Sequence, residues 1–473
     1  MLRPWSVNIQ LDESAEKAIY LQIADAIIHD IKMGRLKAGE ALPGSRLLAQ
    51  LLKVNRNTVV DALQVLLMEG WLVSKERKGT FVAETTPTLQ LQKDLPVTTS
   101  TAAVAIQKAH TIVFDDGHPD SKIAPINELA RAYRQIFSRK ARWKVMDYAC
   151  ELGSMEFRKA IAQMLNHQRG MQINESQVCI TRGSQMATYL AAQCLLEKGD
   201  AVMIETPGYK PAWAAFEKAG AELLPVRVDG DGLVIDDILH HLQSKKRIKA
   251  IFTTPHRQYP TTVTLSLQRR YQLVELSNKY GFTIIEDDYD NEFHFGYRPF
   301  MPISSLPGLA NFIYIGTMSK VVAPALRTGY LVSSRASFIE SIGELRKIID
   351  VQGDIIMEQA VLQLIHDGTI KRHIKKATLH YKAKRDKMSE LLGEHLATYF
   401  NYTVPEGGLA FWLTPKENLD TTSFFHQLSQ KNISLPPSSQ FYFGKNQYGI
   451  RLGYGSLSED TIAEGVKLIA SVL

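Results

Sequence analysis

Two stretches of the sequence place ionisable side chains directly behind short apolar runs. Residues 283–285 are followed by Glu286, Asp287, Asp288, Tyr289 and Asp290. A role in stability does not explain four acids directly behind a buried apolar run, because burying a carboxylate costs free energy unless the carboxylate is paired. Metal ligation or pairing with a ligand cation explains them better.

The second stretch follows residues 312–315 and contains Thr317, Ser319 and Lys320. A lysine in such a position is usually only solvated. This one stands among hydroxyl groups and follows an acidic segment in the chain, and Arg327 comes seven residues later. An amine, hydroxyl groups and a guanidinium are therefore expected in one region.

Two further segments could complete a binding site. Gly183, Ser184 and Gln185 follow residues 178–181 and begin a helix, whose amide groups could hold an anion. Taken alone, these three residues are better explained by an ordinary capped helix. Tyr209 lies in a turn after residues 201–204 and presents an aromatic ring, which could also be plain surface packing.

Together these groups match the needs of pyridoxal 5′-phosphate. Its aldehyde needs a lysine amine for a Schiff base, and its pyridinium nitrogen needs a carboxylate. Its phosphate is held by hydroxyl groups, helix amides and an arginine. Its ring needs a stacking partner, and its phenolate oxygen needs a donor such as a tyrosine. The sequence therefore predicts this cofactor.

The elements that position these groups alternate in the way of an α/β domain. Short apolar runs at 178–181, 201–204, 248–252, 283–285 and 312–315 are separated by segments with helical periodicity, such as 185–197, 212–218 and 267–279. This pattern predicts a mostly parallel sheet with helices on both faces. Ligands of such sheets bind beyond the carboxyl ends of the strands, where the residues above are expected.

The first eighty residues have a different pattern. Three amphipathic segments end near Gly34, Leu52 and Gly70, and two short strand-like runs follow around a basic turn that contains Lys78 and Gly79. Three helices and a basic hairpin outline a winged helix-turn-helix, and a small helical docking domain with a basic face is the alternative. The exposed start of the third helix, Arg56, Asn57 and Thr58, suits contacts with base edges and phosphates.

This first region resembles the DNA-binding domain of the GntR family. The motifs G-x-L-x-x-G-x-x-L-P, S-R-x-L-A, N-R-N-T-V and E-G-W-L occur in order between residues 19 and 82. The resemblance implies contacts with double-stranded operator DNA from Arg46, Arg56, Thr58 and Gly79. Asn57 and Lys78 join them on the chemistry of their side chains.

From about residue 114 the chain resembles the fold-type I aminotransferases, and with its first region it resembles the MocR/GabR-type subfamily of GntR regulators. The blocks ITRGSQMATYLAAQCLLEKGDAVMIETPGY, TTPHRQYPTTVTLS, IIEDDYDNEF and YIGTMSKVVAPALRTGYLV carry this resemblance. It implies that Lys320 forms the Schiff base, Asp287 pairs with the pyridinium nitrogen and Tyr289 meets the phenolate oxygen. It also implies that Tyr209 stacks on the ring and that the phosphate is held by Gly183, Ser184, Gln185, Thr317, Ser319 and Arg327.

The resemblance extends to an effector site and to a homodimer. Arg451 falls where the family binds the carboxylate of an amino-acid ligand, and Tyr148 where a residue enters the partner subunit's site. Two positions depart from the family pattern. Thr262 replaces a glycine, and Tyr259 replaces the asparagine that holds the phenolate oxygen in full aminotransferases. Both departures argue against efficient transamination.

Composition and length set the frame for these domains. A chain of 473 residues with 45% hydrophobic and 22% charged residues has room for two or three globular domains. We expect a winged helix-turn-helix over 15–83, a linker over 84–110 and an aminotransferase-like domain over 111–473. Three cysteines without paired spacing, no apolar run near the roughly 20 residues of a membrane span and no signal peptide predict a cytoplasmic protein without a membrane partner or metal site.

The function expected from these features is that of a transcription regulator. The winged helix would bind an operator, and the second domain would bind pyridoxal phosphate and sense that cofactor, a small amino compound, or both. The alternative is a working aminotransferase that carries a DNA-binding domain. Weak or vestigial transamination fits the two departures.

Overall fold

The computed structural model describes residues 9, 11–12, 17–75, 78–85, 111–138, 142–296, 300–417, 419–444 and 448–473. Contacts between residues divide the chain into two units, Met1–Val104 and Ala105–Leu473, which we call the head and the body. Of the linker predicted over 84–110, residues 86–110 lie outside the described part.

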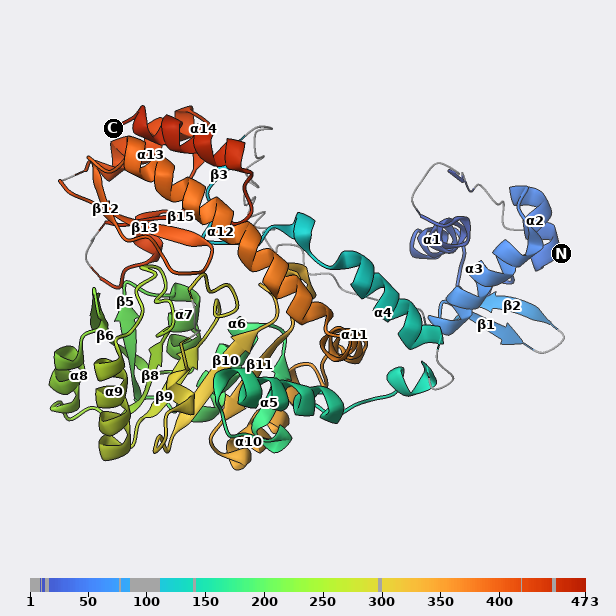
Figure 1. Cartoon of the computed structure of the whole chain (residues 1–473). Coiled ribbons are helices and arrows are strands. Elements are labelled where there is room, and N and C mark those ends of the chain that lie inside the picture. The colour runs from blue at the N-terminus through green and yellow to red at the C-terminus, as the bar shows by residue number, and fades with distance from the viewer. Residues whose placement is uncertain are drawn as a thin grey trace. The chain divides into compact units, whose positions relative to one another are not determined.

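The head consists of three helices followed by an antiparallel hairpin (Figure 1). Its elements are α1 (Ile19–Lys32), α2 (Ser45–Leu52), α3 (Arg56–Met68), β1 (Leu72–Lys75) and β2 (Gly79–Val82). Apolar residues at helical spacing, such as Ile23 and Ile27 of α1 and Leu66 of α3, are completely buried together. Each such side chain contributes roughly 1.5–3 kcal/mol to stability, so the pattern seen in the sequence also holds the head together.

A large sheet of eight strands forms the centre of the body (Figure 1). Its order is β4 (Val178–Thr181), β11 (Gly329–Ser333), β10 (Phe312–Thr317), β9 (Thr283–Asp287), β8 (Ile248–Thr253), β5 (Ala201–Thr206), β6 (Glu222–Asp229) and β7 (Gly232–Leu233). The neighbours from β10 to β6 are parallel to one another, whereas β11 and β7 run antiparallel to their partners. The carboxyl ends of the parallel strands therefore meet at one edge.

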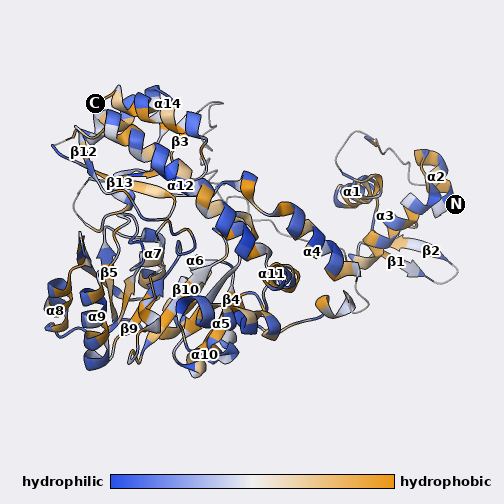
Figure 2. Ribbon diagram, viewed as in Figure 1, coloured by the Kyte–Doolittle hydropathy of each residue, from blue (hydrophilic) through white to orange (hydrophobic). Residues whose placement is uncertain are grey.

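Helices cover both faces of this sheet because its strands are apolar on both sides. Val178 and Ile180 of β4 pack in one core, whereas Cys179 between them packs in another. Orange strands flanked by helices with blue and orange faces show the same arrangement in Figure 2. The covering helices are α5 (Met155–Arg169), α6 (Ser184–Leu195), α7 (Lys210–Lys218), α8 (Ile235–Leu242), α9 (Leu267–Tyr280), α10 (Ala336–Ile349) and α11 (Ile355–His366), and α4 (Ile126–Ser138) packs on α11.

The C-terminal part of the body is a smaller layer built on the long helix α12 (Thr369–His395) (Figure 1). It contains the antiparallel sheet β12 (Phe400–Tyr402), β13 (Ala410–Pro415) and β15 (Ile450–Gly453), with helices α13 (Thr421–Gln430) and α14 (Glu459–Ala470). Strand β3 (Ile112–Val113) pairs in parallel with β14 (Ile433–Ser434). This pairing ties the start of the body to its end and fixes the segment that follows β3.

Short 3₁₀ turns complete the fold at η1 (Ser121–Ile123), η2 (Arg142–Val145), η3 (Glu175–Gln177), η4 (Ile303–Ser305), η5 (Pro324–Leu326) and η6 (Ser438–Gln440). The predicted architecture, a winged helix-turn-helix and an α/β domain with a mostly parallel sheet, is confirmed. Among the described residues, every helix is too short or too polar to cross a membrane.

Candidate functional site

A cavity of about 200 Å³ lies at the carboxyl edge of the large sheet. The residues that line it come from the ends of β9 and β10 and from the turns after β4, β5, β8 and β10, together with the segment after β3. They are Asp116, His118, Pro119, Ser184, Tyr209, Thr254, Tyr259, Asp287, Tyr289, Thr317, Ser319, Lys320, Pro324 and Arg327. The structure thus brings together all the predicted cofactor residues except Gly183 and Gln185.

Asp287 is the last residue of β9 and is buried at the cavity. Its Oδ1 atom has no hydrogen-bond partner among the described residues. Burial, and then the negative charge of Asp288, raise the pKa of Asp287 to about 8, although Lys320 acts in the opposite direction. An unpaired buried carboxyl group of this kind suits a ligand that brings a positively charged nitrogen.

The neighbouring carboxylate, Asp288, is already paired on the other side of the strand. It forms an ion pair with Arg169 of α5 and accepts a hydrogen bond of 2.7 Å from the hydroxyl of Tyr314. Burial opposes its ionisation, but Arg169 and the other partners hold the pKa of Asp288 below its usual value. Adjacent acids thus take different roles, because one faces the cavity and the other faces an arginine.

Lys320 lies in the turn after β10 and reaches into the same cavity. Its Nζ atom donates a hydrogen bond of 2.7 Å to the carbonyl oxygen of Gly117 and stands 5.0 Å from the ring centre of Tyr289. The hydroxyl of Tyr289 is buried without a hydrogen-bond partner in the described part of the chain. Because burial raises the pKa of Tyr289, this hydroxyl stays protonated and can donate to a ligand oxygen.

The opposite group of lining residues can hold an anion. Ser184 begins α6, so the amide groups of that helix end point toward this region. Arg327, with φ 48°, approaches Gly183, where an added Cβ would come within 2.8 Å of its guanidinium. Gly183 permits this close approach, and its φ of 79° lies in the left-handed region that favours glycine. The Ser319 hydroxyl is buried without a hydrogen-bond partner among the described residues. The Thr317 hydroxyl donates a hydrogen bond of 3.2 Å to the carbonyl oxygen of Thr328.

Of the two predicted cofactor residues Tyr209 and Gln185, only Tyr209 lines the cavity. Tyr209 precedes α7 and lines the cavity, and its ring meets that of Tyr259 edge-on at 5.2 Å between centres. Burial, and then the nearby Asp287 and Asp116 charges, raise the pKa of Tyr209 to about 12. Gln185 donates instead to the carbonyl oxygen of Pro211 at 2.8 Å and does not line the cavity.

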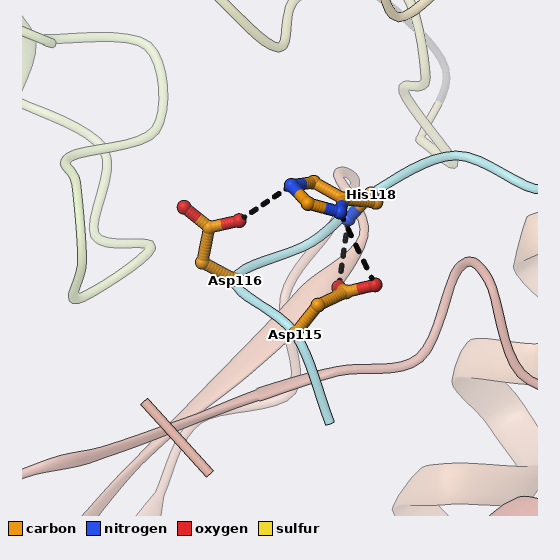
Figure 3. Close-up of side chains that lie close together, drawn as sticks. All are labelled: Asp115, Asp116 and His118. Atoms are coloured by element: carbon orange, nitrogen blue, oxygen red, sulfur yellow. Dashed lines mark hydrogen bonds and ion pairs between the residues drawn. The ribbon is translucent and has the colours of Figure 1, made fainter. Parts of the chain in front are cut away.

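The segment after β3 was not among the predicted site residues, but it contributes Asp116 and His118 to the cavity. Figure 3 shows the His118 ring between two acids, with Nε2 3.1 Å from Asp116 and Nδ1 3.5 Å from Asp115. Asp115 also accepts the N–H groups of Gly117 and His118 at 2.8 Å each. The sequence did contain a signal for this segment: acids follow directly after the apolar residues 112–114, which is the same pattern that identified Asp287.

Arg451 of β15 is buried behind the cavity and does not line it. Its Nε donates to the carbonyl oxygen of Asp116 at 2.8 Å, its Nη1 donates to that of Pro260 at 2.6 Å, and its guanidinium lies 4.9 Å from the ring centre of Tyr259. Tyr148, the other predicted effector residue, is 89% exposed. The two residues are thus not brought together within one chain.

The two departures from the family pattern, Thr262 and Tyr259, change the backbone conformation and the lining of the cavity, respectively. Thr262 adopts φ 66°, the left-handed conformation that a glycine would take more easily. Tyr259 lines the cavity and donates from its hydroxyl to Asp116 at 3.2 Å. The position of the expected asparagine is therefore occupied by a group that interacts with the segment after β3.

In the head, the predicted DNA-binding residues gather on the helix-turn-helix and the hairpin. Arg46 of α2 and Arg56 and Asn57 of α3 are exposed, and Thr58 is half-buried. Asn55 caps α3 by accepting the N–H of Asn57 at 2.9 Å. Lys78 and Gly79 are exposed at the hairpin turn, where Gly79 has φ 108°.

Comparison with known protein families assigns both units. Residues 113–469 match the model of aminotransferase class I and II, which covers most of the chain. The chain belongs to the aminotransferase class I and II family. Residues 19–82 match the bacterial regulatory proteins of the gntR family. This aminotransferase-family chain therefore carries a GntR DNA-binding domain, the arrangement of MocR-type regulators.

Relatives of this family member include regulators that match over nearly the whole length. The probable rhizopine catabolism regulatory protein MocR of Rhizobium meliloti is 27% identical, covering 98% of this chain and 95% of that protein. The HTH-type transcriptional regulator TauR of Rhodobacter capsulatus is 28% identical, covering 96% of each.

Solved structures match the aminotransferase-like body. The α-aminoadipate aminotransferase LysN of Thermus thermophilus, complexed with N-(5′-phosphopyridoxyl)-L-leucine, is 25% identical with a TM-score of 0.71, covering 76% of this chain and 92% of that one. A multiple substrate aminotransferase of Thermococcus profundus is 28% identical with a TM-score of 0.72, covering 78% and 92%.

Proposed function

We propose that this chain is a transcription regulator that binds operator DNA through its head and pyridoxal 5′-phosphate through its body. The observation that carries this proposal is the buried carboxyl group of Asp287, whose Oδ1 has no partner among the described residues, in one cavity with Lys320 in a chain with a GntR domain. The full-length similarity to the regulators MocR and TauR supports it. Such a regulator acts in the cytoplasm, where we place it together with its operator.

The residues around the cavity fit this cofactor. Asp287, Tyr289 and Ser319 each have a buried polar atom without a hydrogen-bond partner in the described part of the chain. These atoms suit the ring nitrogen, the phenolate oxygen and the phosphate of the cofactor, respectively. Tyr209 would lie against the ring. Ser184, Thr317 and Arg327 would hold the phosphate, with Gly183 permitting the approach of Arg327. The cofactor supplies an aldehyde that reacts with primary amines, and Lys320 offers the amine in this cavity.

A small amino compound would be the effector, and a homodimer would be the active assembly. The exposure of Tyr148 supports the dimer, because Trp143 and Met146 beside it are also large, apolar and exposed. Exposed apolar groups of this kind gain from burial against a second subunit. In a dimer Tyr148 would enter the partner's cavity, as predicted from the sequence.

A working aminotransferase remains the second candidate. The similarity of the body to solved aminotransferases and the presence of Lys320 and Asp287 favour it. Tyr259 and the strained Thr262 argue against efficient turnover. The two functions differ in what an amino compound does: a regulator changes its DNA affinity, whereas an aminotransferase passes the amino group to a keto acid.

An absorbance titration tests the proposal. Purified full-length protein would be mixed with pyridoxal phosphate and then with a panel of amino acids and amines. We expect a visible band from the bound cofactor that is absent in Lys320→Ala and unchanged in Lys245→Ala, an exposed lysine outside the cavity. A wild-type protein without this band at excess cofactor would overturn the proposal. Multiple turnover with a keto acid at about 1–10³ s⁻¹, without any effect on DNA binding, would favour the aminotransferase.

A further inference from the structure

Part of the cavity is not used by the cofactor residues, and its chemistry bears on the effector. Asp116, His118 and Tyr259 line the cavity and are connected to one another by hydrogen bonds, and we call them the Asp116 cluster. Asp116 accepts the Tyr259 hydroxyl at 3.2 Å on Oδ2 and faces His118 Nε2 at 3.1 Å on Oδ1. The side chain of Asp116 is still 35% exposed, so a ligand in the cavity can reach it.

The carboxylate of Asp116 is ionised. Burial opposes its charge, but the hydrogen bond with His118 and the charges of Lys320 and Arg451 hold its pKa well below the usual value. A carboxylate offers about four acceptor positions, so the two existing partners leave room for further donors. Asp116 therefore presents negative charge and acceptor capacity to the cavity.

His118 does not cancel this negative charge. Its ring lies between Asp116 and Asp115 (Figure 3), so a protonated imidazole would face two carboxylates. The side chain of His118 is 63% exposed and is therefore open to water. Asp115, Asp116 and His118 together keep a net negative charge whether the imidazole is protonated or neutral.

The cationic side chains near Asp116 donate hydrogen bonds to backbone carbonyl groups. Among the described lining residues, Arg327 approaches Gly183 and Arg182 at the anion-binding region, and Lys320 is the amine expected to react with the cofactor. Arg451 does not line the cavity, and two of its donors serve backbone carbonyl groups. The hydrogen bonds that Arg327 and Arg451 donate thus go to backbone carbonyl groups and leave acceptor capacity on the Asp116 carboxylate for a ligand.

We propose that the effector carries two amino groups. The first replaces the Lys320 amine on the aldehyde carbon of the cofactor, so that one carbon–nitrogen bond forms, another breaks and Lys320 is released as a free amine. The second pairs, as an ammonium group, with the carboxylate of Asp116. This inference rests on the proposed function. An ammonium–carboxylate hydrogen bond in a partly buried site improves affinity by roughly 10- to 100-fold over a ligand that leaves the carboxylate unpaired. A ligand with a terminal carboxylate would instead bring like charges together.

A series of four-carbon ligands tests the inference. Full-length protein loaded with pyridoxal phosphate would be titrated with 1,4-diaminobutane, 1-aminobutane and 4-aminobutanoate, with binding followed by calorimetry and by the visible spectrum. 1,3-Diaminopropane and 1,5-diaminopentane extend the series in length. We expect the best diamine to bind about 10- to 100-fold more tightly than 1-aminobutane, and 4-aminobutanoate to bind more weakly than either.

Matched variants locate the effect. Asp116→Asn should reduce the preference for the diamine over 1-aminobutane to within about threefold while the visible band of the cofactor remains. Asp115→Asn is the control, because Asp115 does not line the cavity and an asparagine oxygen can still accept the N–H groups of Gly117 and His118. Its diamine preference should match that of the wild type.

Several outcomes would overturn the inference and leave the proposed function intact. These are a visible band together with equal or tighter binding of 4-aminobutanoate, or an unchanged preference in Asp116→Asn. The inference would also be overturned if the wild type lost its preference for the diamine when a metal chelator is added, because the cluster would then act through a metal ion. Absence of the visible band would instead contradict the proposed function itself. The wild-type series decides the matter even where Asp116→Asn fails to fold.

Discussion

At the scale of single residues, the site depends on acids that are close in sequence but differ in environment. Asp288 is ion-paired with Arg169, and Asp116 is held ionised by the charged groups around it. Asp287 has no ion pair among the described residues, and its Oδ1 atom lies at the cavity without a hydrogen-bond partner from them. Burial selects its protonated form until a cationic ligand arrives. The cofactor site is thus a place where folding leaves a polar group unsatisfied.

The free energy of unfolding of the cofactor-free protein should depend on pH because of the buried Asp287 carboxyl group. The pKa of Asp287 is raised to about 8 from an unfolded value of 3.8, so the folded form holds an extra proton between these values. Asp287 therefore contributes most stability below about pH 4, and that contribution is lost as the pH rises toward 8. The slope is up to about 1.4 kcal/mol per pH unit.

Asp287→Asn tests this dependence because an amide does not ionise. We expect the cofactor-free variant to lose less stability than the wild type between pH 5 and pH 8, measured by urea unfolding at each pH. Glu292, whose pKa burial also raises to about 8, keeps its own contribution in both proteins. Parallel stability curves for the two proteins would contradict the raised pKa of Asp287.

Arg451 is expected to act on stability as well as on ligands. Its guanidinium is buried and donates to the carbonyl oxygens of Asp116 and Pro260, which belong to segments far apart in the chain. Arg451→Ala should therefore lower the free energy of unfolding of the body by about 2–5 kcal/mol, because it leaves buried acceptors unpaired. Thermal and urea unfolding measure this, with Arg335→Ala as a more exposed control. An unchanged stability would restrict Arg451 to ligand binding.

At the scale of elements, local sequence patterns predicted most of the strands and helices around the site. The expected helix 267–279 corresponds to α9 (Leu267–Tyr280), and the acids behind 283–285 indeed end β9 at the cavity. Apolar periodicity and strand-end chemistry are local properties, so one sequence suffices to detect them.

What the sequence could not predict depends on contacts between distant segments. The segment with Asp116 reaches the cavity because β3 pairs with β14, some 320 residues later in the chain, and because Arg451 binds its backbone. Arg451 was predicted to bind the effector. The packing of β15 shows that its guanidinium donates hydrogen bonds to backbone carbonyl groups. Neither pairing leaves a trace in local periodicity.

The helix-turn-helix makes an element-scale prediction of its own. Arg56 stands exposed at the first turn of α3, capped by Asn55, whereas Lys78 stands on the hairpin turn. Arg56→Ala should weaken operator binding by about 1–3 kcal/mol and relax the base preference, because an arginine there can read a base edge. Lys78→Ala should weaken binding to all sequences and flatten the salt dependence.

Fluorescence anisotropy with operator and scrambled duplexes at several salt concentrations separates the two effects. Lys53→Ala, an exposed lysine at the end of α2, provides a comparison within the same domain. Operator affinity that stays at the wild-type level in both Arg56→Ala and Lys78→Ala would contradict the placement of DNA on α3 and the hairpin.

At the scale of the whole molecule, the proposed function joins two units through thermodynamic linkage. If an amino compound in the body changes operator affinity of the head by some factor, operator DNA must change the affinity for that compound by the same factor. Couplings of this kind are typically about 5- to 150-fold. The relation holds for any relative arrangement of head and body, so it tests function without reference to that arrangement.

The experiment measures both sides of this relation on one protein. Operator affinity would be determined with and without a saturating diamine, and diamine affinity with and without saturating operator, all in the presence of pyridoxal phosphate. We expect the two ratios to agree, and both to fall toward one in Lys320→Ala, which cannot bond the cofactor. A sensor gains nothing from turnover, because transamination destroys the ligand that carries the signal, so transfer of the amino group should stay well below the ~1–10³ s⁻¹ of ordinary enzymes. Ratios of one on both sides, with fast transfer to a keto acid, would identify an enzyme whose DNA-binding domain does not respond to its substrate.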